Sequence, residues 1–128
     1  MNQLQNLLHD TLIATGHVQQ CALIKRKDAS LKASSVGFTV EHDQAKQLVE
    51  SFKAPTDLRG SGLLYCGIRY KCVRTDKNSI YAKHNDTGVI LARTSSLIII
   101  GTYSTTMHPS ICVAAVERLA DYFRDKSK

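Results

Sequence analysis

The sequence contains no apolar run approaching the roughly 20 residues that a membrane-spanning helix requires. It has no Lys or Arg before Lys25, and polar residues interrupt its N-terminal apolar stretch, which is unlike a secretory signal peptide. Cys-x-x-Cys spacing is also missing. We therefore expect a cytosolic protein whose cysteines are buried, reduced thiols: Cys21, Cys66, Cys72 and Cys112.

The common catalytic and metal-binding patterns are absent as well. The chain has no phosphate-cradling glycine-rich loop, no His-Glu-x-x-His and no Gly-x-Ser-x-Gly. Its five histidines are scattered, with no two at a spacing typical of metal ligands. A nucleophile pair of a cysteine and a histidine is the one catalytic arrangement that the sequence does not exclude. We expect a binding protein rather than an enzyme, with no catalytic residues, metal or cofactor.

What the chain does have is positive charge on an ordinary globular composition. Its 17 Lys and Arg against 11 Asp and Glu give a net charge of +6, and 43% of its residues are hydrophobic. Such a charge attracts acidic partners, and nucleic acid, a phosphoinositide membrane and an acidic protein all qualify. The length predicts one domain, 1–128, with a single core.

The last third of the chain organises the expected fold. Residues 97–100 form a short run rich in β-branched side chains, which predicts a strand buried on both faces. Pro109 suits the first turn of a helix, which the apolar spacing extends to about Arg124. Two overlapping apolar stripes mark its inner face: Ile111, Ala115, Leu119 and Tyr122, and Cys112, Val116, Leu119 and Phe123.

The N-terminal part predicts a helix followed by a hairpin. Leucines recur at helical spacing over residues 2–15, and Gly16 is a typical helix end. Two short apolar segments, 21–24 and 30–34, flank a charged turn and predict paired strands.

A short helix and a strand meander follow. Thr39 is expected to cap the helix, Pro55 to stop it, and residues 57–62 to form a polar link. Gly88 is expected to be a hairpin residue. Period-two patterns predict five strands, at 63–65, 68–74, 79–83, 89–93 and 97–102.

Links this short join antiparallel neighbours. The expected fold class is therefore α+β. It is a single antiparallel sheet of about seven strands, with the N- and C-terminal helices packed together on one face and the short helix elsewhere.

Several motifs give these elements a family likeness. The chain closes with Gly101-Thr102-Tyr103, Met107-His108-Pro109 and the helix sequence Val116-Glu117-Arg118-Leu119-Ala120-Asp121-Tyr122, and Tyr65-Cys66-Gly67-Ile68-Arg69-Tyr70 precedes them. This pattern resembles the profilin family over the whole length, and most closely a divergent animal paralogue. The resemblance implies a profilin-like fold and a monomeric, non-enzymatic regulator of the actin cytoskeleton in the cytoplasm.

Profilins hold proline-rich ligands on aromatic rings between their two terminal helices, and this chain departs from that pattern. The family's ring positions correspond here to Gln3, Asn6 and Lys32, and the chain has no tryptophan. Tyr122 is either a remnant of the polyproline site or simply a packed helix residue. The resemblance therefore implies little or no polyproline binding.

The family's actin-binding positions are partly retained. In the last helix, Val113, Ala114 and Arg118 stand where many animal profilins carry Asn, Lys and Glu, and Arg118 reverses a charge. This implies weakened binding of actin monomers or, alternatively, a working interface that has been rebuilt. The matching positions, which also fit an ordinary solvated strand face, are Arg69, Lys71, Val73, Arg74, Lys83, Asn85, Met107 and His108.

Anionic phospholipid is the family partner least disturbed by these changes, and its attachment would be peripheral to the membrane and sensitive to salt. Nucleic acid is not expected, because the strands lack stacking aromatic residues of the exposed type. Arg69 and Lys71 share a strand face, whereas Arg74 joins them only if a bulge near Val73 shifts the alternation. The lipid-binding cations are expected in two clusters, Arg69, Lys71, Arg74 and Lys83 in the meander and Lys25 and Lys27 in the hairpin.

Overall fold

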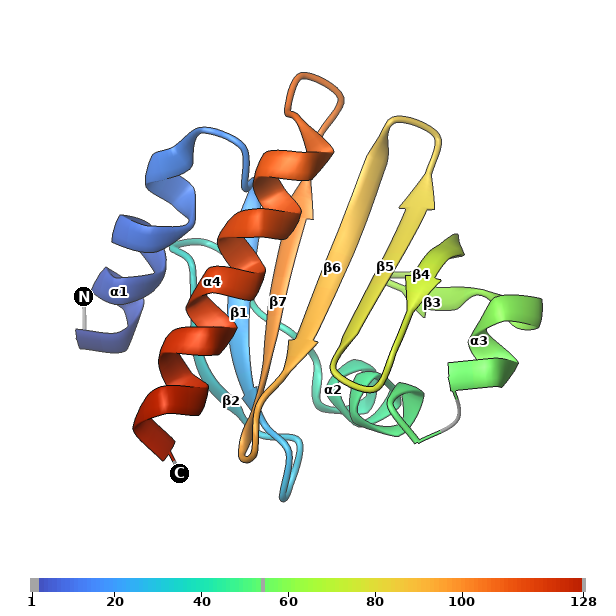
Figure 1. Ribbon diagram of the computed structural model, residues 1–128, viewed down its shortest axis with the longest axis horizontal. Coiled ribbons are helices and arrows are strands. Elements are labelled where there is room, and N and C mark those ends of the chain that lie inside the picture. Colours follow the sequence, from blue (N-terminus) through green and yellow to red (C-terminus); the bar gives the residue numbers. More distant parts are fainter. Residues whose placement is uncertain (1–2, 54, 128) are drawn as a thin grey trace.

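The computed structural model describes residues 3–53 and 55–127 and shows a seven-stranded antiparallel sheet with helices on both faces (Figure 1). The strands lie in the order β2-β1-β7-β6-β5-β4-β3. Helices α1 and α4 lie side by side over one face, and α2 covers the other, so the expected α+β arrangement is confirmed. The strands are β1 (Gln20–Lys25), β2 (Leu31–Ser34), β3 (Leu63–Tyr65), β4 (Ile68–Thr75), β5 (Ser79–His84), β6 (Thr87–Arg93) and β7 (Leu97–Tyr103). The helices are α1 (Gln3–Thr11), the 3-10 helix η1 (Ile13–Thr15), α2 (His42–Ser51), α3 (Pro55–Ser61) and α4 (Pro109–Ser127).

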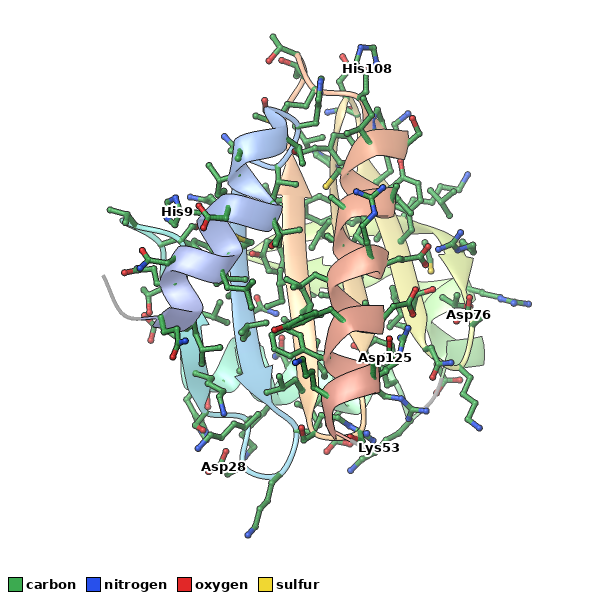
Figure 2. All side chains as sticks on the ribbon, turned by 60° about the vertical axis from the view of Figure 1, so that its left-hand side comes forward. His9, Asp28, Lys53, Asp76, His108 and Asp125 are labelled. Carbon is green, nitrogen blue, oxygen red and sulfur yellow. The ribbon has the colours of Figure 1, made fainter. Side chains whose placement is uncertain are left out.

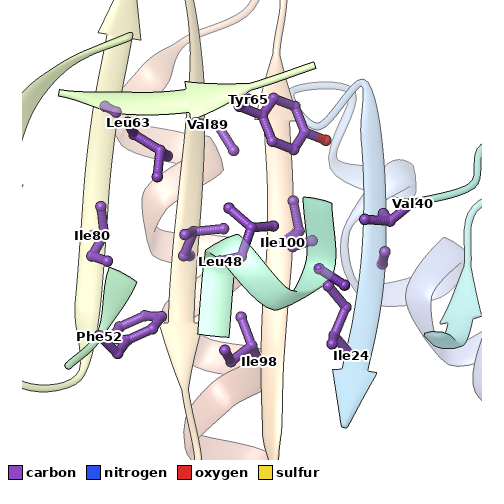
Figure 3. Packing of buried hydrophobic residues seen from close by; sticks show 14 of the residues in the cluster. Ile24, Val40, Leu48, Phe52, Leu63, Tyr65, Ile80, Val89, Ile98 and Ile100 are labelled. Atoms are coloured by element: carbon purple, nitrogen blue, oxygen red, sulfur yellow. The ribbon is translucent and has the colours of Figure 1, made fainter. Parts of the chain in front are cut away.

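Strand β7 lies in the interior of the sheet, because it pairs with β1 on one side and with β6 on the other. Ile98 and Ile100 pack with Leu48 of α2 in one core (Figure 3). Ile99 and Tyr103 point the other way and pack beneath α1 and α4. The predicted strand buried on both faces is therefore confirmed.

Helix α4 packs closely on β7 because Gly101 has no side chain. A Cβ at Gly101 would lie 2.5 Å from Cγ2 of Val116. The buried face of α4 is narrower than the predicted stripes, since Ile111 is 39% and Tyr122 46% exposed. Neither α4 nor any other described helix is long and apolar enough to cross a bilayer.

Two expectations for the segment before β3 are wrong. The backbone stays extended through Glu41, which is the N-cap of α2, so Thr39 is not the cap. Residues 55–61 form helix α3 instead of a polar link. Buried Leu58 anchors α3 to the core, and Gly62, with a φ of +78°, ends it by donating its backbone N–H to the Leu58 carbonyl at 2.8 Å.

The hairpin between β5 and β6 also differs from its prediction. Asn85, with a φ of +54°, and Asp86 form a two-residue link, so Gly88 lies within β6 rather than in the turn. Gly88 is required for another reason: a Cβ there would lie 2.4 Å from the Tyr103 ring. Close packing, and not turn geometry, selects glycine at this position.

The cysteines are not all buried as expected. Cys66 is exposed, because it lies in the tight turn between β3 and β4 with a φ of +51°, and Cys72 is half-buried. Cys21 and Cys112 are buried, and burial raises their pKa values to about 11 and about 12. All four are free thiols.

Candidate binding surfaces

Four cations share the part of the sheet that α4 leaves uncovered. Strand β4 pairs with β5 through a register shift between Cys72 and Arg74. Val73 is the additional residue of this bulge, and it brings Arg74 to the same face as Lys71. The exposed residues Arg69, Lys71, Arg74 and Lys83 are called the basic face below.

Two lysines of the basic face stand directly opposite each other. Lys71 pairs in register with Lys83, and both are exposed. Like charges directly opposite each other destabilise an antiparallel pair. Neither lysine forms an ion pair with any residue that the structure describes. The surface therefore holds an uncompensated positive pair that a bound anion would stabilise.

Neighbouring elements hold the two arginines. Nη2 of Arg74 donates to Oε1 of Glu117 on α4 at 2.7 Å and to Oγ of Ser79 at 3.3 Å. Nη1 of Arg69 donates to the Ser61 carbonyl at 2.7 Å. The Arg74 and Glu117 side chains are 46% and 41% exposed, so their pair contributes only about 0–1 kcal/mol and can open toward another anion. Sequence reasoning did not identify Glu117 as the partner of Arg74, because no local pattern indicates a contact between residues 43 positions apart.

The remaining expected actin-binding residues lie at one end of the molecule. His108 precedes α4 at this end (Figure 2), and Met107 is half-buried against the core beneath α4. The backbone N–H of His108 donates to Nδ1 of His17 at 3.0 Å. The turn that carries Asn85 lies at the same end as the start of α4 (Figure 1).

The altered positions of α4 divide between its two flanks. Val113 lies one turn before Glu117, on the flank that reaches toward β4. Arg118 instead lines the groove between α4 and α1, together with Asp10. The charge reversal therefore lies on the opposite flank from the partner of Arg74.

The second expected cationic cluster lies far from His108. Lys25 and Lys27 are exposed at the hairpin of β1 and β2, near the labelled Asp28 in Figure 2.

Among the described residues, no three His, Cys, Asp or Glu side chains gather where they could hold a metal ion.

The family model described as Profilin matches residues 2–128. The chain belongs to the profilin family. It is 47% identical over 127 residues to Profilin-4 of Bos taurus and 43% to Profilin-4 of Mus musculus, and each match covers 98% of both chains. The crystal structure of Acanthamoeba castellanii profilin II matches with a TM-score of 0.89 and 35% identity, over 97% of this chain and 98% of that one. These matches confirm the resemblance based on the closing motifs. Profilins are non-enzymatic, actin-binding proteins of the cytoskeleton.

This profilin has a groove between α1 and α4 where the family's aromatic cradle is expected. Gln3, Asn6 and Tyr122 line the part of this groove beside the start of α1, and the volume of that part is about 410 Å³. The Tyr122 ring contacts Phe123 edge-on, and Nζ of Lys126 lies 5.5 Å from its centroid. Tyr122 is thus a half-exposed ring partly covered by a lysine, and not a core residue of α4.

Binding of a proline-rich peptide to this groove is expected to be undetectable or very weak. Amide side chains at Gln3 and Asn6 cannot supply the ring stacking that a polyproline II helix requires. Calorimetry is the suitable measurement, because the chain has no tryptophan to report binding by fluorescence. The variant Gln3→Trp with Asn6→Tyr should gain affinity. A micromolar Kd for the natural chain, which corresponds to a binding free energy of about −8 kcal/mol, would contradict this prediction.

Proposed function

We propose that this profilin is an actin-cytoskeleton regulator with weakened binding of actin monomers and of polyproline, and with a retained surface for anionic phospholipids. The observation that carries the proposal is the uncompensated Lys71–Lys83 pair at the centre of the basic face. Arg69 and Arg74 extend the same exposed face to four cations. The protein would then act in the cytoplasm and cytoskeleton and attach peripherally to membranes.

A membrane surface suits this arrangement physically. Each cation near an anionic leaflet contributes about 1 kcal/mol, and the contributions require no shaped cavity. The loss of aromatic rings from the α1/α4 groove does not affect them. A phosphoinositide headgroup, with several phosphates, can contact both lysines at once and relieve their repulsion.

Sedimentation with phosphoinositide-containing vesicles tests this proposal. Binding should fall steeply as added salt shortens the Debye length from about 10 Å at 0.1 M to about 3 Å at 1 M. The double variant Lys71→Gln with Lys83→Gln should bind at least about tenfold more weakly, because two cations near the leaflet are lost. Pure phosphatidylcholine vesicles should not bind.

The matched control is Lys46→Gln with Lys77→Gln, which removes the same charge from two exposed positions outside the basic face. If both double variants lost vesicle binding equally, the loss would result from the lower net charge and not from the basic face. Binding that is indifferent to salt would also contradict a lipid-binding basic face.

Weakened actin binding is expected from the residues at Val113, Ala114 and Arg118. Restoring family-like charge with Ala114→Lys and Arg118→Glu should strengthen binding of actin monomers by about tenfold or more, because a repulsive contact becomes attractive. The rate of actin assembly at increasing profilin concentration measures this. If the natural chain already sequesters actin at low micromolar concentration, the alternative of a rebuilt, working interface holds instead.

A further inference from the structure

The turn between β6 and β7, residues 94–96, carries two serines with free hydroxyl groups. Ser95 and Ser96 are both exposed. Among the residues that the structure describes, neither hydroxyl has a hydrogen-bond partner. Oγ1 of Thr94 closes the turn by accepting the backbone N–H of Leu97 at 3.0 Å. The two serine hydroxyls are therefore accessible at the tip of a well-held turn.

Strand pairing determines the direction of the Ser96 side chain. The pairing of β1 with β7 continues past both strands, since the backbone N–H of Arg26 donates to the Ser96 carbonyl at 2.9 Å. Residues opposite each other in an antiparallel pair share a face of the sheet. Ser96 also precedes Ile98 by two residues, and Ile98 pairs with Arg93 and packs in the α2 core. Ser96 and the two arginines consequently share a face, and all three line one pocket.

Positive charge surrounds this serine. The pocket has a volume of about 400 Å³ and is formed by the β1–β2 hairpin, the segment after α2 and the β6–β7 turn. Lys53, labelled in Figure 2, pairs with Glu50 at 3.2 Å, but both side chains are about two-thirds exposed, at 67% and 65%, so the pair is weak. No carboxylate is among the described residues that line the pocket, whereas four cations are: Arg26, Lys27, Lys53 and Arg93.

The two arginines are held in place with unused donors. Nη1 of Arg26 donates to the carbonyls of Thr94 at 2.8 Å and Ser95 at 3.1 Å. The Arg93 guanidinium lies 6.0 Å from the centroid of the Phe52 ring, in a cation–π contact. Within the described part of the chain, no hydrogen bond uses Nε or Nη2 of Arg26 or any guanidinium nitrogen of Arg93. An anion attached at Ser96 would find these donors within the same pocket.

We propose that Ser96 is a phosphorylation site and that the cations of this pocket hold its phosphate once it is attached. The Ser96 hydroxyl oxygen attacks the γ-phosphorus of ATP, the bond to the β-phosphate oxygen breaks, and ADP leaves while a base of the protein kinase takes the hydroxyl proton. The product adds a charge of about −1.5 to −2 and three acceptor oxygens, which match paired guanidinium donors. The site is separate from the basic face and does not depend on lipid binding there.

The sequence before Ser96 fits a kinase that selects basic substrates. Arg93 precedes Ser96 by three residues, and kinases of this class recognise such charge patterns. Lys27 precedes Ser30 by the same spacing, but the Ser30 hydroxyl already donates to the Asp28 carboxylate at 2.7 Å. Of these two serines, only Ser96 therefore combines the basic residue with a free hydroxyl.

Treatment of the intact protein with ATP and the catalytic subunit of cAMP-dependent protein kinase tests the acceptor. Mass spectrometry of the digested product should locate phosphate at Ser96. Ser96→Ala should abolish this phosphorylation, and the matched control Ser95→Ala, on the same turn, should retain it. Both serines are exposed, so neither substitution disturbs the core. Absence of phosphate from Ser96, or equal loss in both variants, would overturn the proposal.

The titration of the attached phosphate tests whether the pocket holds it. In phosphorus NMR, the pKa of the phosphoserine should lie about one pH unit or more below its value in the urea-unfolded protein, because nearby cations stabilise the dianion. Lys27→Gln with Lys53→Gln should raise that pKa toward the unfolded value. The control Lys46→Gln with Lys77→Gln removes the same charge from exposed positions outside the pocket and should change it little. Equal changes in both double variants, or equal pKa values in the folded and unfolded protein, would contradict a phosphate held by this pocket.

Discussion

Leu48→Ala is expected to lower the free energy of unfolding by about 2–5 kcal/mol, a large share of the stability of a single domain. Leu48 is fully buried on α2, against the strands that carry Ile98 and Ile100 (Figure 3). Strand β7 is fixed by neighbours on both sides, so it cannot move to fill the cavity that the shorter side chain leaves. Urea unfolding followed by far-UV circular dichroism measures the loss.

Gln47→Ala is the matched control for this substitution. Gln47 is exposed on the same helix, so its truncation removes no core packing and should change stability by less than about 0.5 kcal/mol. A similar result for both variants would mean that α2 does not anchor this face of the sheet.

Gly88→Ala is expected to cost about 1–3 kcal/mol through overpacking. The added Cβ would lie 2.4, 2.5 and 2.6 Å from Cε2, Cζ and the hydroxyl oxygen of Tyr103. The ring is 1% exposed and its hydroxyl is hydrogen-bonded to that of Tyr81 at 2.7 Å, so it cannot turn aside without breaking this hydrogen bond. Thermal unfolding of both proteins gives the difference.

Gly60→Ala makes the same chemical change in an open position. Nothing lies within 4 Å of a Cβ at Gly60, which is within α3, and alanine favours a helix over glycine by roughly 0.5–1 kcal/mol. The two substitutions should therefore shift stability in opposite directions. Stabilisation by Gly88→Ala would show that the Tyr103 ring is far more mobile than its contacts indicate.

The sequence was most informative where local pattern and burial agree. Residues 97–100 are apolar on both sides of the strand, and the structure buries them on both sides. The sequence predicted only that Arg74 shares a face with Lys71 if a bulge lies near Val73. It could not predict the bulge itself, because a single inserted residue does not alter the apolar pattern recognisably. The likeness at the C-terminal helix identified the family before any geometry was known.

Features that depend on a distant contact could not be predicted in this way. Among the side chains of helix α3 that the structure describes, only Leu58 is buried, and the helix contains Gly60, so no apolar period marks it as a helix. The need for glycine at Gly88 comes from a ring 15 residues further along the chain.

The position of β7 between β1 and β6 also determines when the sheet can form during synthesis. Lys25 of β1 pairs with Leu97, about 70 residues later in the chain. At the usual rate of about 5–20 residues per second, a ribosome needs several seconds to make that interval. Throughout this time the apolar strand β1 has β2 as its only partner, and its inner edge is open to other chains. The free edge of the early β1–β2 hairpin is therefore covered only when β7, the last strand of the chain, has been made.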